Sequence, residues 1–385
     1  MSENDQLDDP ISDFEIDHDK MTEIIEEHVN KGELVVASDI LPTDLPIIPL
    51  RPRPACPGIM IPLVLNGQAQ VAAMHQAWQR FGSLPWKDLL QPAHQLASEG
   101  FEINPDLANV LNMASSILNY YSKGSAYIKK DGQPWVAGDL LVQKDLAWSI
   151  AQIMENGADA FYNGKLAGRI AKAFEKSGGI ISQKDLAAYK VKERVPVSTG
   201  YRGKQVISMP PVSGGGVTLL QMLNMLEHFP VAGQGAGSAK NLHLLAEVMK
   251  RAAANRRSLL GDPDFVKVYV EGYISKDLAK KMADDIDIEH ATDVKTIKAE
   301  PVERYESRNT TQFSVMDKFG NAVSNTYTLG YSFGSGYVAE GTGILFDNQM
   351  RNFSYQGDGN HMNAMVPGKR MLSTMTPTIV MNEDG

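Results

Sequence analysis

Two threonine hydroxyls, those of Thr310 and Thr328, stand on the two arms of one predicted hairpin. Residues 310–316 and 322–329 have the composition of β-strands, and Gly320 can adopt the positive φ that closes the short loop between them. A threonine hydroxyl attacks a carbonyl group only when a nearby base takes its proton. The hairpin is therefore the first place to look for nucleophilic chemistry.

The register of this hairpin decides whether the two hydroxyls can meet. If the loop is centred on residue 319, Asp317 faces Asn321, and the same register carried outward places Thr310 opposite Thr328. A slip of one residue would move Thr328 to the other face of the sheet. Because opposed threonines are common in sheets for structural reasons, the geometry alone does not establish a reaction.

A serine nucleophile is a competing interpretation. Residues 330–334 (GYSFG) match the spacing of the serine-hydrolase elbow around Ser332, and Asp347 and His361 follow in the expected order. The elbow requires a helix directly after the sharp turn, whereas residues 334–338 (GSGYV) lack helical periodicity. We therefore expect no serine nucleophile here.

The segments before the hairpin are predicted to be mainly helical between residues 66 and 187. Their apolar residues recur at three- and four-residue spacing, and we expect the aromatic and methionine positions among them to lie in the core. Further helices are expected near 140–155 and 164–176. The first apolar series in this region consists of Val71, Met74, Trp78 and Phe81, and the second of Leu89, Ala93, Leu96 and Ala97.

A strand, a glycine-rich turn and a helix are expected in succession after residue 203. Residues 210–216 (PPVSGGG) form the turn, Ser213 can cap the helix, and the ending of a phosphate-binding loop is absent. Residues 239–260 predict a long helix. Its basic residues, expected to form an exposed or salt-bridged face, are Lys250, Arg251, Arg256 and Arg257. A further strand is expected over 373–381.

Composition excludes several classes of protein. The net charge of -9 argues against a nucleic-acid partner, which requires clustered Lys and Arg. The single cysteine, Cys56, cannot form an internal disulfide. The acidic start has no apolar segment typical of a signal peptide, and no membrane segment is expected. The compartment therefore stays undetermined.

No metal or cofactor is expected from the spacing of the possible ligands. Asp13, Glu15 and Asp17 mimic the start of a calcium loop, but His18 stands where that loop needs glycine. Residues 1–30 are otherwise typical of a solvated acidic tail, and residues 42–62, with seven prolines, of an extended connector.

Several long motifs, in one order, resemble the gamma-glutamyltransferase family of N-terminal-nucleophile hydrolases. The most specific one starts at Thr310 and reads TTQFSVMD, followed by GNAV from Gly320. The resemblance covers roughly residues 65–385. The other matching stretches are 81–86 (FGSLPW), 157–164 (GADAFYNG), 210–224, 326–329 (TYTL), 341–345 (GTGIL), 348–350 (NQM) and 367–379 (PGKRMLSTMTPTI).

The resemblance implies an α+β fold, a four-layer αββα sandwich in which helices cover two sheets. It implies that the chain cuts itself between Asn309 and Thr310 and that Thr310 is the catalytic nucleophile, with its freed α-amine as base. The domains expected are an acidic tail and connector over 1–64, a large-subunit region over 65–309 and a β-rich small-subunit region over 310–385.

The resemblance also implies the roles of the other site residues. Thr328 would orient Thr310, Gln349 and Asn352 would bind the substrate α-amino group, and Ser373 and Thr374 would bind its α-carboxylate. The substrates would be glutathione or other gamma-glutamyl compounds, with water, amino acids or peptides as acceptors. The two pieces of the precursor would stay together as a heterodimer, and family members are typically periplasmic or extracellular.

Three departures from the family pattern affect these expectations. The family usually has an acid at the position of Asn352 and often an asparagine at that of Gly330, so less polar contact with an amino group is expected. The glycine pair whose N–H groups stabilise the oxyanion follows the 378–379 strand in the family, and the sequence reaches Gly385 without it. The alternatives are an acylase on the same scaffold, acting on glutaryl or cephalosporin-like amides, and a truncated inactive family member.

Overall fold

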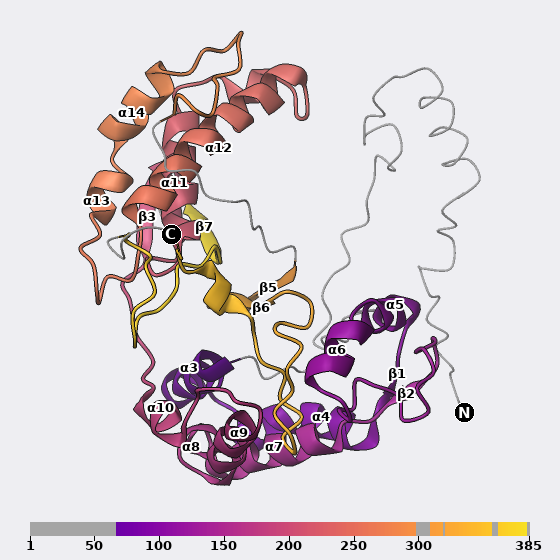
Figure 1. The fold of residues 1–385 in the computed structure, drawn as a ribbon. Coiled ribbons are helices and arrows are strands. Elements are labelled where there is room, and N and C mark those ends of the chain that lie inside the picture. The colour runs from indigo at the N-terminus through magenta and orange to yellow at the C-terminus, as the bar shows by residue number, and fades with distance from the viewer. Residues whose placement is uncertain (1–66, 298–308, 319, 356–360, 383–385) are drawn as a thin grey trace, which may run out of the picture. The chain divides into compact units, whose positions relative to one another are not determined.

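The structure, a computed structural model, describes residues 67–297, 309–318, 320–355 and 361–382 (Figure 1). These residues all belong to one unit of the chain, Ile61–Gly385. The acidic tail, the proline-rich connector, the calcium-loop mimic and Cys56 lie outside the described residues. None of the helices in the described part combines the length and the apolar character that a membrane crossing needs.

Helices dominate the described residues up to Asp284 (Figure 1). The segments with periodic apolar residues form helices as predicted, and the two apolar series between residues 71 and 97 lie in α3 and α4. The helices are α3 (Gly67–Phe81), α4 (Trp86–Glu99), α5 (Pro105–Met113), α6 (Ser115–Tyr121), α7 (Lys144–Asn156), α8 (Asp159–Tyr162), α9 (Lys165–Lys176), α10 (Gln183–Ala188), α11 (Gly214–Leu226), α12 (Ala239–Leu259), α13 (Val270–Tyr273) and α14 (Lys276–Asp284), with the 3-10 turns η1 (Val231–Gly233) and η2 (Gln349–Asn352).

The strands form three small antiparallel sheets in the described residues. One sheet pairs β1 with β2, the second has the order β3-β4-β7, and the third is the predicted hairpin, β5 with β6. The bounds are β1 (Phe101–Glu102), β2 (Leu140–Leu141), β3 (Val197–Tyr201), β4 (Lys204–Ser208), β5 (Asn309–Met316), β6 (Ala322–Gly330) and β7 (Thr378–Asn382). The strand expected over 373–381 therefore begins only at Thr378.

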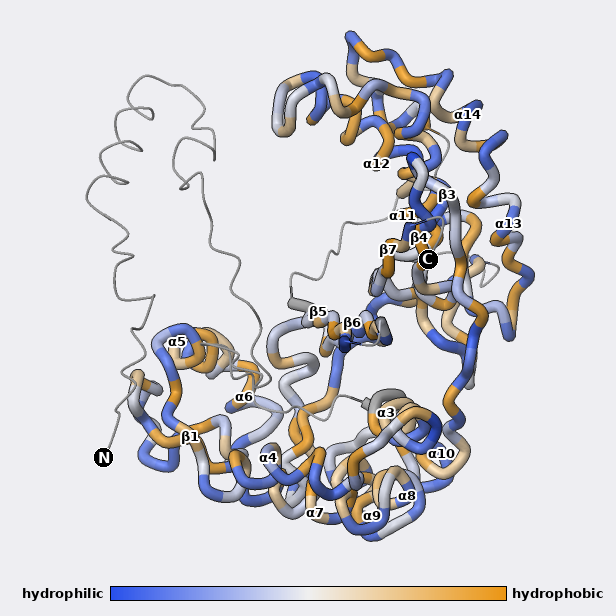
Figure 2. Tube along the Cα trace, turned by 180° about the vertical axis from the view of Figure 1, so that it is seen from behind, coloured by the Kyte–Doolittle hydropathy of each residue, from blue (hydrophilic) through white to orange (hydrophobic). Residues whose placement is uncertain are grey.

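One hydrophobic core lies among α3, α4 and α7–α10, along which apolar and polar positions alternate (Figure 2). Its buried members include Phe161, Leu166 and Ile170. The expectation that the methionine and aromatic residues of α3 are core residues is wrong at two positions, since Met74 is 48% and Phe81 76% exposed. Helical spacing shows which residues share a face but not how much of that face a neighbouring element covers.

The segment after β6 packs into this helical region (Figure 1). Ile344 and Phe346 join the core of α7 and α9, while Phe333 and Leu345 join the neighbouring cluster around Leu118. Two buried serines, one in α7 and one directly after α6, hold the segment by its main chain. Ser149 Oγ donates to Thr342 O over 2.6 Å, and Ser122 Oγ donates to Gly336 O over 2.6 Å. The residues on either side of position 309 therefore share their cores.

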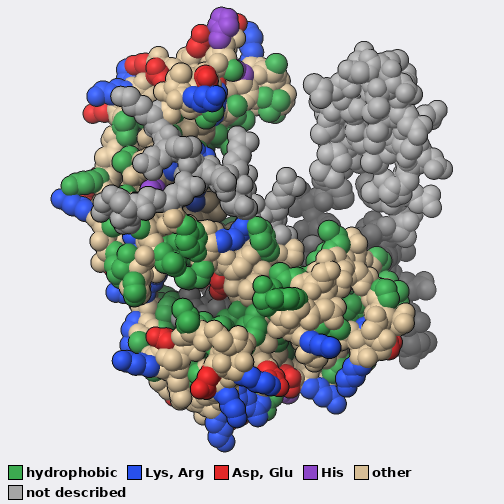
Figure 3. Space-filling model, viewed as in Figure 1, with side chains coloured by type: hydrophobic (Ala, Val, Ile, Leu, Met, Phe, Trp, Pro, Cys, Tyr) green, Lys and Arg blue, Asp and Glu red, His purple; other side chains and the backbone are tan. Residues whose placement is uncertain are grey.

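The strand β7 provides a second link between distant parts of the sequence. It pairs along its whole length with β4, from Ser208 opposite Thr378 to Lys204 opposite Asn382. It also lies next to the hairpin, because Thr378 N donates to Ser324 Oγ of β6 over 3.1 Å. The helices α11, α12 and α14 form a further core beside the β3-β4-β7 sheet, with Leu244, Val248 and Ala252 buried. On the face shown in Figure 3, acidic and basic side chains are interspersed.

Candidate active site

A pocket of about 330 Å³ brings together five of the site residues expected from the sequence. Thr328 comes from β6, Gln349 and Asn352 from η2, and Ser373 and Thr374 from the segment that precedes β7. These three segments are separated by 18 residues or more along the chain. Their side chains meet because η2 folds back against the end of β6 and because β7 pairs with β4 beside the hairpin.

The hairpin has the predicted register over most of its length. Thr311 pairs with Tyr327 and Met316 with Ala322, and Gly320 in the loop has a φ of 84°. Asp317 N donates to Asn321 O over 3.0 Å, which confirms that these two residues face each other.

The register shifts at the end of the hairpin, where Thr310 lies. Asn309 pairs with Gly330, so that β6 has two residues, Thr328 and Leu329, where β5 has only Thr310. The prediction that Thr310 and Thr328 form a regular opposed pair is therefore wrong in detail, because a bulge intervenes. Bulges bend a strand and redirect its side chains, and they are frequent beside active sites. The strand alternation could not have shown this extra residue.

Thr328, one of the two residues of β6 in this bulge, makes two hydrogen bonds. Its Oγ1 accepts a hydrogen bond from Gly330 N over 3.0 Å, and its carbonyl oxygen accepts one from Gln349 Nε2 over 2.9 Å. The second bond ties η2 to β6 and fixes the orientation of the Gln349 amide in the pocket. The first bond holds the hydroxyl of Thr328 close to its own main chain.

Asp347 shapes η2 from its N-terminal side. Its Oδ1 accepts a hydrogen bond from Gln349 N over 2.9 Å, which satisfies a main-chain donor at the start of the turn. Burial raises the pKa of Asp347, and its hydrogen bonds with main-chain N–H groups only partly offset this effect. At the other end of η2, Asn363 Nδ2 donates to Asn352 O over 2.6 Å. The two expected amino-group ligands thus stand on a turn held at both ends.

Gly330 has a conformation that its glycine identity permits. Its φ is 91°, and a Cβ at this position would clash with Oδ1 of Asn348, which accepts a hydrogen bond from Tyr331 N over 3.2 Å. A larger residue at position 330 would therefore require the Asn348 side chain to move. Gly330 lines the pocket with its main chain and offers no side chain to a ligand, as expected from the sequence.

The serine-hydrolase interpretation fails on the local structure. Residues 331–336 form turns after β6 and no helix begins there, so Ser332 does not stand on a strand-turn-helix elbow. His361 Nδ1 accepts a hydrogen bond from Asn363 N over 3.0 Å, and Asp347 is engaged with η2. Neither residue is bonded to Ser332 in the described part of the chain.

Sequence reasoning missed other residues that line the same pocket. Thr326 lies two residues before Thr328 on β6, and Gln312 is its cross-strand partner, to which the Thr326 hydroxyl donates. The period-two alternation of a strand could have found Thr326, since it shares a face with Thr328. Met375 and Thr376 follow the expected Ser373 and Thr374 and also line the pocket.

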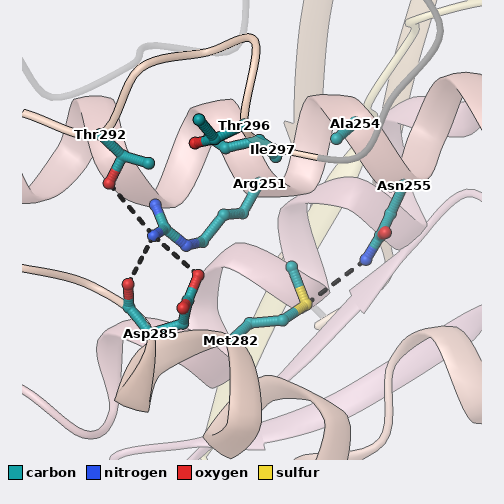
Figure 4. Close-up of a pocket in the computed structure, with 8 residues that line it drawn as sticks. All are labelled: Arg251, Ala254, Asn255, Met282, Asp285, Thr292, Thr296 and Ile297. Carbon is teal, nitrogen blue, oxygen red and sulfur yellow. Dashed lines mark hydrogen bonds and ion pairs between the residues drawn. The ribbon is translucent and has the colours of Figure 1, made fainter.

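A second pocket, of about 480 Å³, lies between α12, α14 and the segment that follows α14 (Figure 4). Arg251, only 4% exposed, donates to Glu247, to Asp285 and to the hydroxyl of Thr292. Glu247 is buried, yet hydrogen bonds from Lys250, Arg251 and Thr292 outweigh its burial and lower its pKa to about 2. The basic face of α12 is thus salt-bridged at Lys250 and Arg251, and Arg251 is buried rather than exposed.

Among the described residues, no three His, Cys, Asp or Glu side chains form a cluster that could hold a metal ion. The candidate site consists of hydroxyl, amide and main-chain groups, together with Met375, around a small pocket. Such groups can hold a zwitterionic or anionic acyl chain through directed hydrogen bonds.

The family model of gamma-glutamyltranspeptidase matches residues 68–385. The glutathione hydrolase proenzyme of Escherichia coli (strain K12) is 45% identical over 322 residues, which cover 81% of this chain and 56% of that protein. The crystal structure of cephalosporin acylase from Bacillus halodurans superposes with a TM-score of 0.71 at 29% identity, covering 81% of this chain and 56% of that chain.

The crystal structure of Helicobacter pylori gamma-glutamyltranspeptidase superposes with a TM-score of 0.58 at 40% identity, covering 61% of this chain and 69% of that chain. The chain thus spans just over half the length of the curated relative from Escherichia coli. These solved structures share with it a mixture of helices and strands. On the family match and on this level of identity, the chain belongs to the gamma-glutamyltranspeptidase family.

Proposed function

We propose that the chain is a gamma-glutamyltransferase and glutathione hydrolase that cuts itself between Asn309 and Thr310. The observation that carries this proposal is the single pocket lined by Thr328, Gln349 and Asn352 together with Ser373 and Thr374. These are five residues to which the family motifs assign substrate contacts or the positioning of the nucleophile. The identity to the glutathione hydrolase proenzyme of Escherichia coli supports the same activity.

In the first step the Thr310 hydroxyl attacks the carbonyl carbon of Asn309, and the peptide nitrogen leaves as the free α-amine of Thr310. Water then hydrolyses the resulting ester and separates residues 1–309 from 310–385. An α-amine has an ordinary pKa of about 7.7–8.0, so it can take up a proton near neutral pH. Thr310 would then supply both the nucleophile and its base, with Thr328 as the neighbour that positions it.

In the second step the Thr310 hydroxyl attacks the γ-carbonyl carbon of glutathione or a related gamma-glutamyl amide. The α-amine accepts the hydroxyl proton and passes it to the leaving amine, and an acyl ester on Thr310 remains. Water or the amino group of an amino acid or peptide then attacks the ester and releases glutamate or a new gamma-glutamyl compound. The enzyme returns to its starting state without a cofactor.

The pocket offers a suitable polarity for a gamma-glutamyl chain. The hydrogen bond from Gln349 Nε2 to Thr328 O orients the amide, and its Oε1 can accept from a substrate ammonium group. Asn352 would contribute a second amide oxygen. Ser373 and Thr374, on the segment before β7, would form the α-carboxylate end of the pocket. The Thr374 hydroxyl would donate to the carboxylate, because Ser373 gives its single hydroxyl proton to Ser213.

We extend the proposal to the whole architecture. The small sheets around the hairpin would be parts of a four-layer αββα sandwich, with an acidic tail and connector over 1–64, a large-subunit region over 65–309 and a small-subunit region over 310–385. Support comes from the shared cores and from β7, which joins the sheet of β3 and β4 across the expected cleavage site. The two pieces would therefore remain associated after the cut.

The test is the intact mass of the purified protein combined with hydrolysis of γ-glutamyl-p-nitroanilide. We expect masses that correspond to a cut after Asn309, and a single uncut chain for Thr310→Ala. Two polypeptides from Thr310→Ala, or turnover by an uncut native chain, would overturn the proposal.

A second candidate function is an acylase acting on glutaryl amides, which lack the α-amino group. It is favoured by the neutral amide of Asn352, which lines the pocket and holds an ammonium group less strongly than a carboxylate does. The likeness to cephalosporin acylase from Bacillus halodurans points in the same direction.

Comparison of γ-glutamyl- and glutaryl-p-nitroanilide separates the two candidates. A higher kcat/KM for the glutaryl compound would favour the acylase, and a higher value for the γ-glutamyl compound the transferase. In either case Asn352→Asp should shift the ratio of the two kcat/KM values towards the γ-glutamyl substrate by about tenfold, because a carboxylate holds an ammonium group more strongly than an amide does.

A further inference from the structure

Ser373 is held by the turn before α11 through three of its own atoms. Its N–H donates to Val212 O over 3.3 Å, its carbonyl oxygen accepts from Gly214 N over 2.9 Å, and its hydroxyl donates to Ser213 Oγ over 2.9 Å. Ser213 and Ser373 also form an isolated parallel bridge. Residues 212–214, at the start of α11, therefore hold in place the segment that carries the expected carboxylate ligands.

Ser213 is the central residue of these three. It is fully buried, and its hydroxyl donates to Met375 O over 2.6 Å while it accepts from Ser373. Since a carbonyl oxygen can only accept, the single proton of Ser213 is committed to Met375. One hydroxyl thus bonds the residues on both sides of Thr374, which lies between them and lines the pocket.

The close fit of the turn to this segment has a second source. A Cβ at Gly215, the second residue of α11, would lie 2.6 Å from Thr374 O and 2.7 Å from Met375 O, so only glycine allows the start of α11 to approach the main chain of these residues. Arg256 of α12 adds a further donor to Ser373 O, at 3.4 Å. The approach of turn and segment is therefore set by backbone contacts, and Ser213 supplies their side-chain link.

We propose that Ser213 is a positioning residue of the substrate carboxylate subsite, acting through Ser373 and Met375. The inference rests on the proposed function only for the identity of the ligand, an acyl chain that ends in a carboxylate. Without the Ser213 hydroxyl, Ser373 Oγ, Met375 O and Gly215 N each lose a hydrogen-bond partner, and the side-chain link that fixes the residues on both sides of Thr374 is lost. Ser213 itself would not contact the substrate.

Three acyl p-nitroanilides isolate the carboxylate. The γ-glutamyl compound has both polar groups, the glutaryl compound only the carboxylate, and the 4-aminobutyryl compound only the ammonium group. For the full chain with Ser213→Ala, we expect KM to rise about tenfold for the first two, the size of one lost buried hydrogen bond, with kcat little changed. KM for the 4-aminobutyryl compound should stay as in the native chain.

Ser208→Ala is the matched control. Ser208 is equally buried, and its hydroxyl also bonds a carbonyl and a hydroxyl of the same distant segment, Pro377 O and Thr378 Oγ1, each at 3.0 Å. Neither partner lines the pocket. A general loosening of the β7 segment would affect both variants, whereas loss of the carboxylate subsite would affect only Ser213→Ala.

Calorimetry with glutaramic acid and 4-aminobutyramide separates a failure of this inference from a failure of the proposed function. If the native chain hydrolyses none of the anilides but binds glutaramic acid, the proposed reaction is wrong. The carboxylate subsite is then still tested by the binding measurement. Ser213→Ala should then weaken binding of glutaramic acid by about tenfold and leave that of 4-aminobutyramide unchanged.

Several results would overturn the inference. They are equal effects of Ser213→Ala on all three anilides, equal effects of Ser213→Ala and Ser208→Ala, and no binding of glutaramic acid by the native chain. Ser213→Cys, which keeps a weak donor, should give intermediate KM values. If both Ser213 variants fold but stay uncut, the residue acts in maturation and the inference is wrong.

Discussion

The side-chain amide of Gln349 donates from Nε2 to the main-chain oxygen of Thr328 over 2.9 Å. This bond joins the turn expected to hold the substrate amino group to the strand that flanks the expected cleavage site. The turn η2 and the strand β6 are thus joined by a hydrogen bond between residues 21 positions apart.

Replacing Gln349 by Ala should lower kcat/KM for γ-glutamyl-p-nitroanilide by about tenfold or more, because both the tie to Thr328 and the amide oxygen are lost. Met350→Ala is the control, since Met350 is the next residue of η2 but is exposed. Steady-state kinetics checks the prediction, and similar losses in the two variants would contradict it.

Thr328→Val should slow both maturation and hydrolysis by about tenfold or more, whereas Thr328→Ser should stay close to the native chain. Valine keeps the shape of the side chain but removes the hydroxyl oxygen that accepts from Gly330 N beside the bulge. The rate of appearance of the cut chain on a denaturing gel measures the first effect. Normal maturation of Thr328→Val would show that the hydroxyl has no part in it.

Gly215→Ala should destabilise the protein by about 1–3 kcal/mol or more, because the added methyl group meets main-chain oxygens that cannot move aside. Gly168→Ala, in the middle of α9, should instead stabilise it by about 0.5–1 kcal/mol, since nothing lies within 4 Å of the added group and alanine favours a helix. Urea unfolding of both variants tests the contrast. A neutral Gly215→Ala would mean that the turn does not press against Thr374 and Met375.

Glu247→Gln should destabilise the protein at pH 7 by about 3 kcal/mol, because it removes the buried carboxylate beside Arg251 and leaves only the exposed one of Asp285. Asp284→Asn, which breaks the exposed Lys280–Asp284 pair of the same i,i+4 spacing, should cost at most about 0.5 kcal/mol. Urea unfolding at pH 7 compares them, and equal losses would contradict the role of burial.

The same carboxylate predicts a pH dependence of stability. The pKa of Glu247 in the folded chain is about 2, below its ordinary value of 4.5, so the ionised form favours folding. Its contribution is complete above pH 4.5 and is lost as the pH falls towards 2, in total about 3 kcal/mol. Urea unfolding between pH 5 and pH 2.5 should therefore show a steeper loss of stability in the native chain than in Glu247→Gln.

The helices and the hairpin could be predicted from the sequence because their signals are local. Three- and four-residue spacing of apolar residues marked α3 and α4, and Gly320 marked the loop between β5 and β6. The strand β7 was placed only roughly, since its first expected residues bond to the turn before α11 and not to a strand. Such pairing with a distant segment leaves no periodic mark in the sequence.

The sequence by itself determined the family motifs, the order of the main helices and of the hairpin, and five of the residues that line the pocket. Tertiary structure alone decided that Ser213 is hydrogen-bonded to Ser373, that a bulge lies beside Thr310 and that Arg251 is buried with Glu247. The physical reason is that periodicity and turn chemistry act over a few neighbouring residues. Hydrogen bonds that join residues 160 positions apart exist only after the cores on either side have packed.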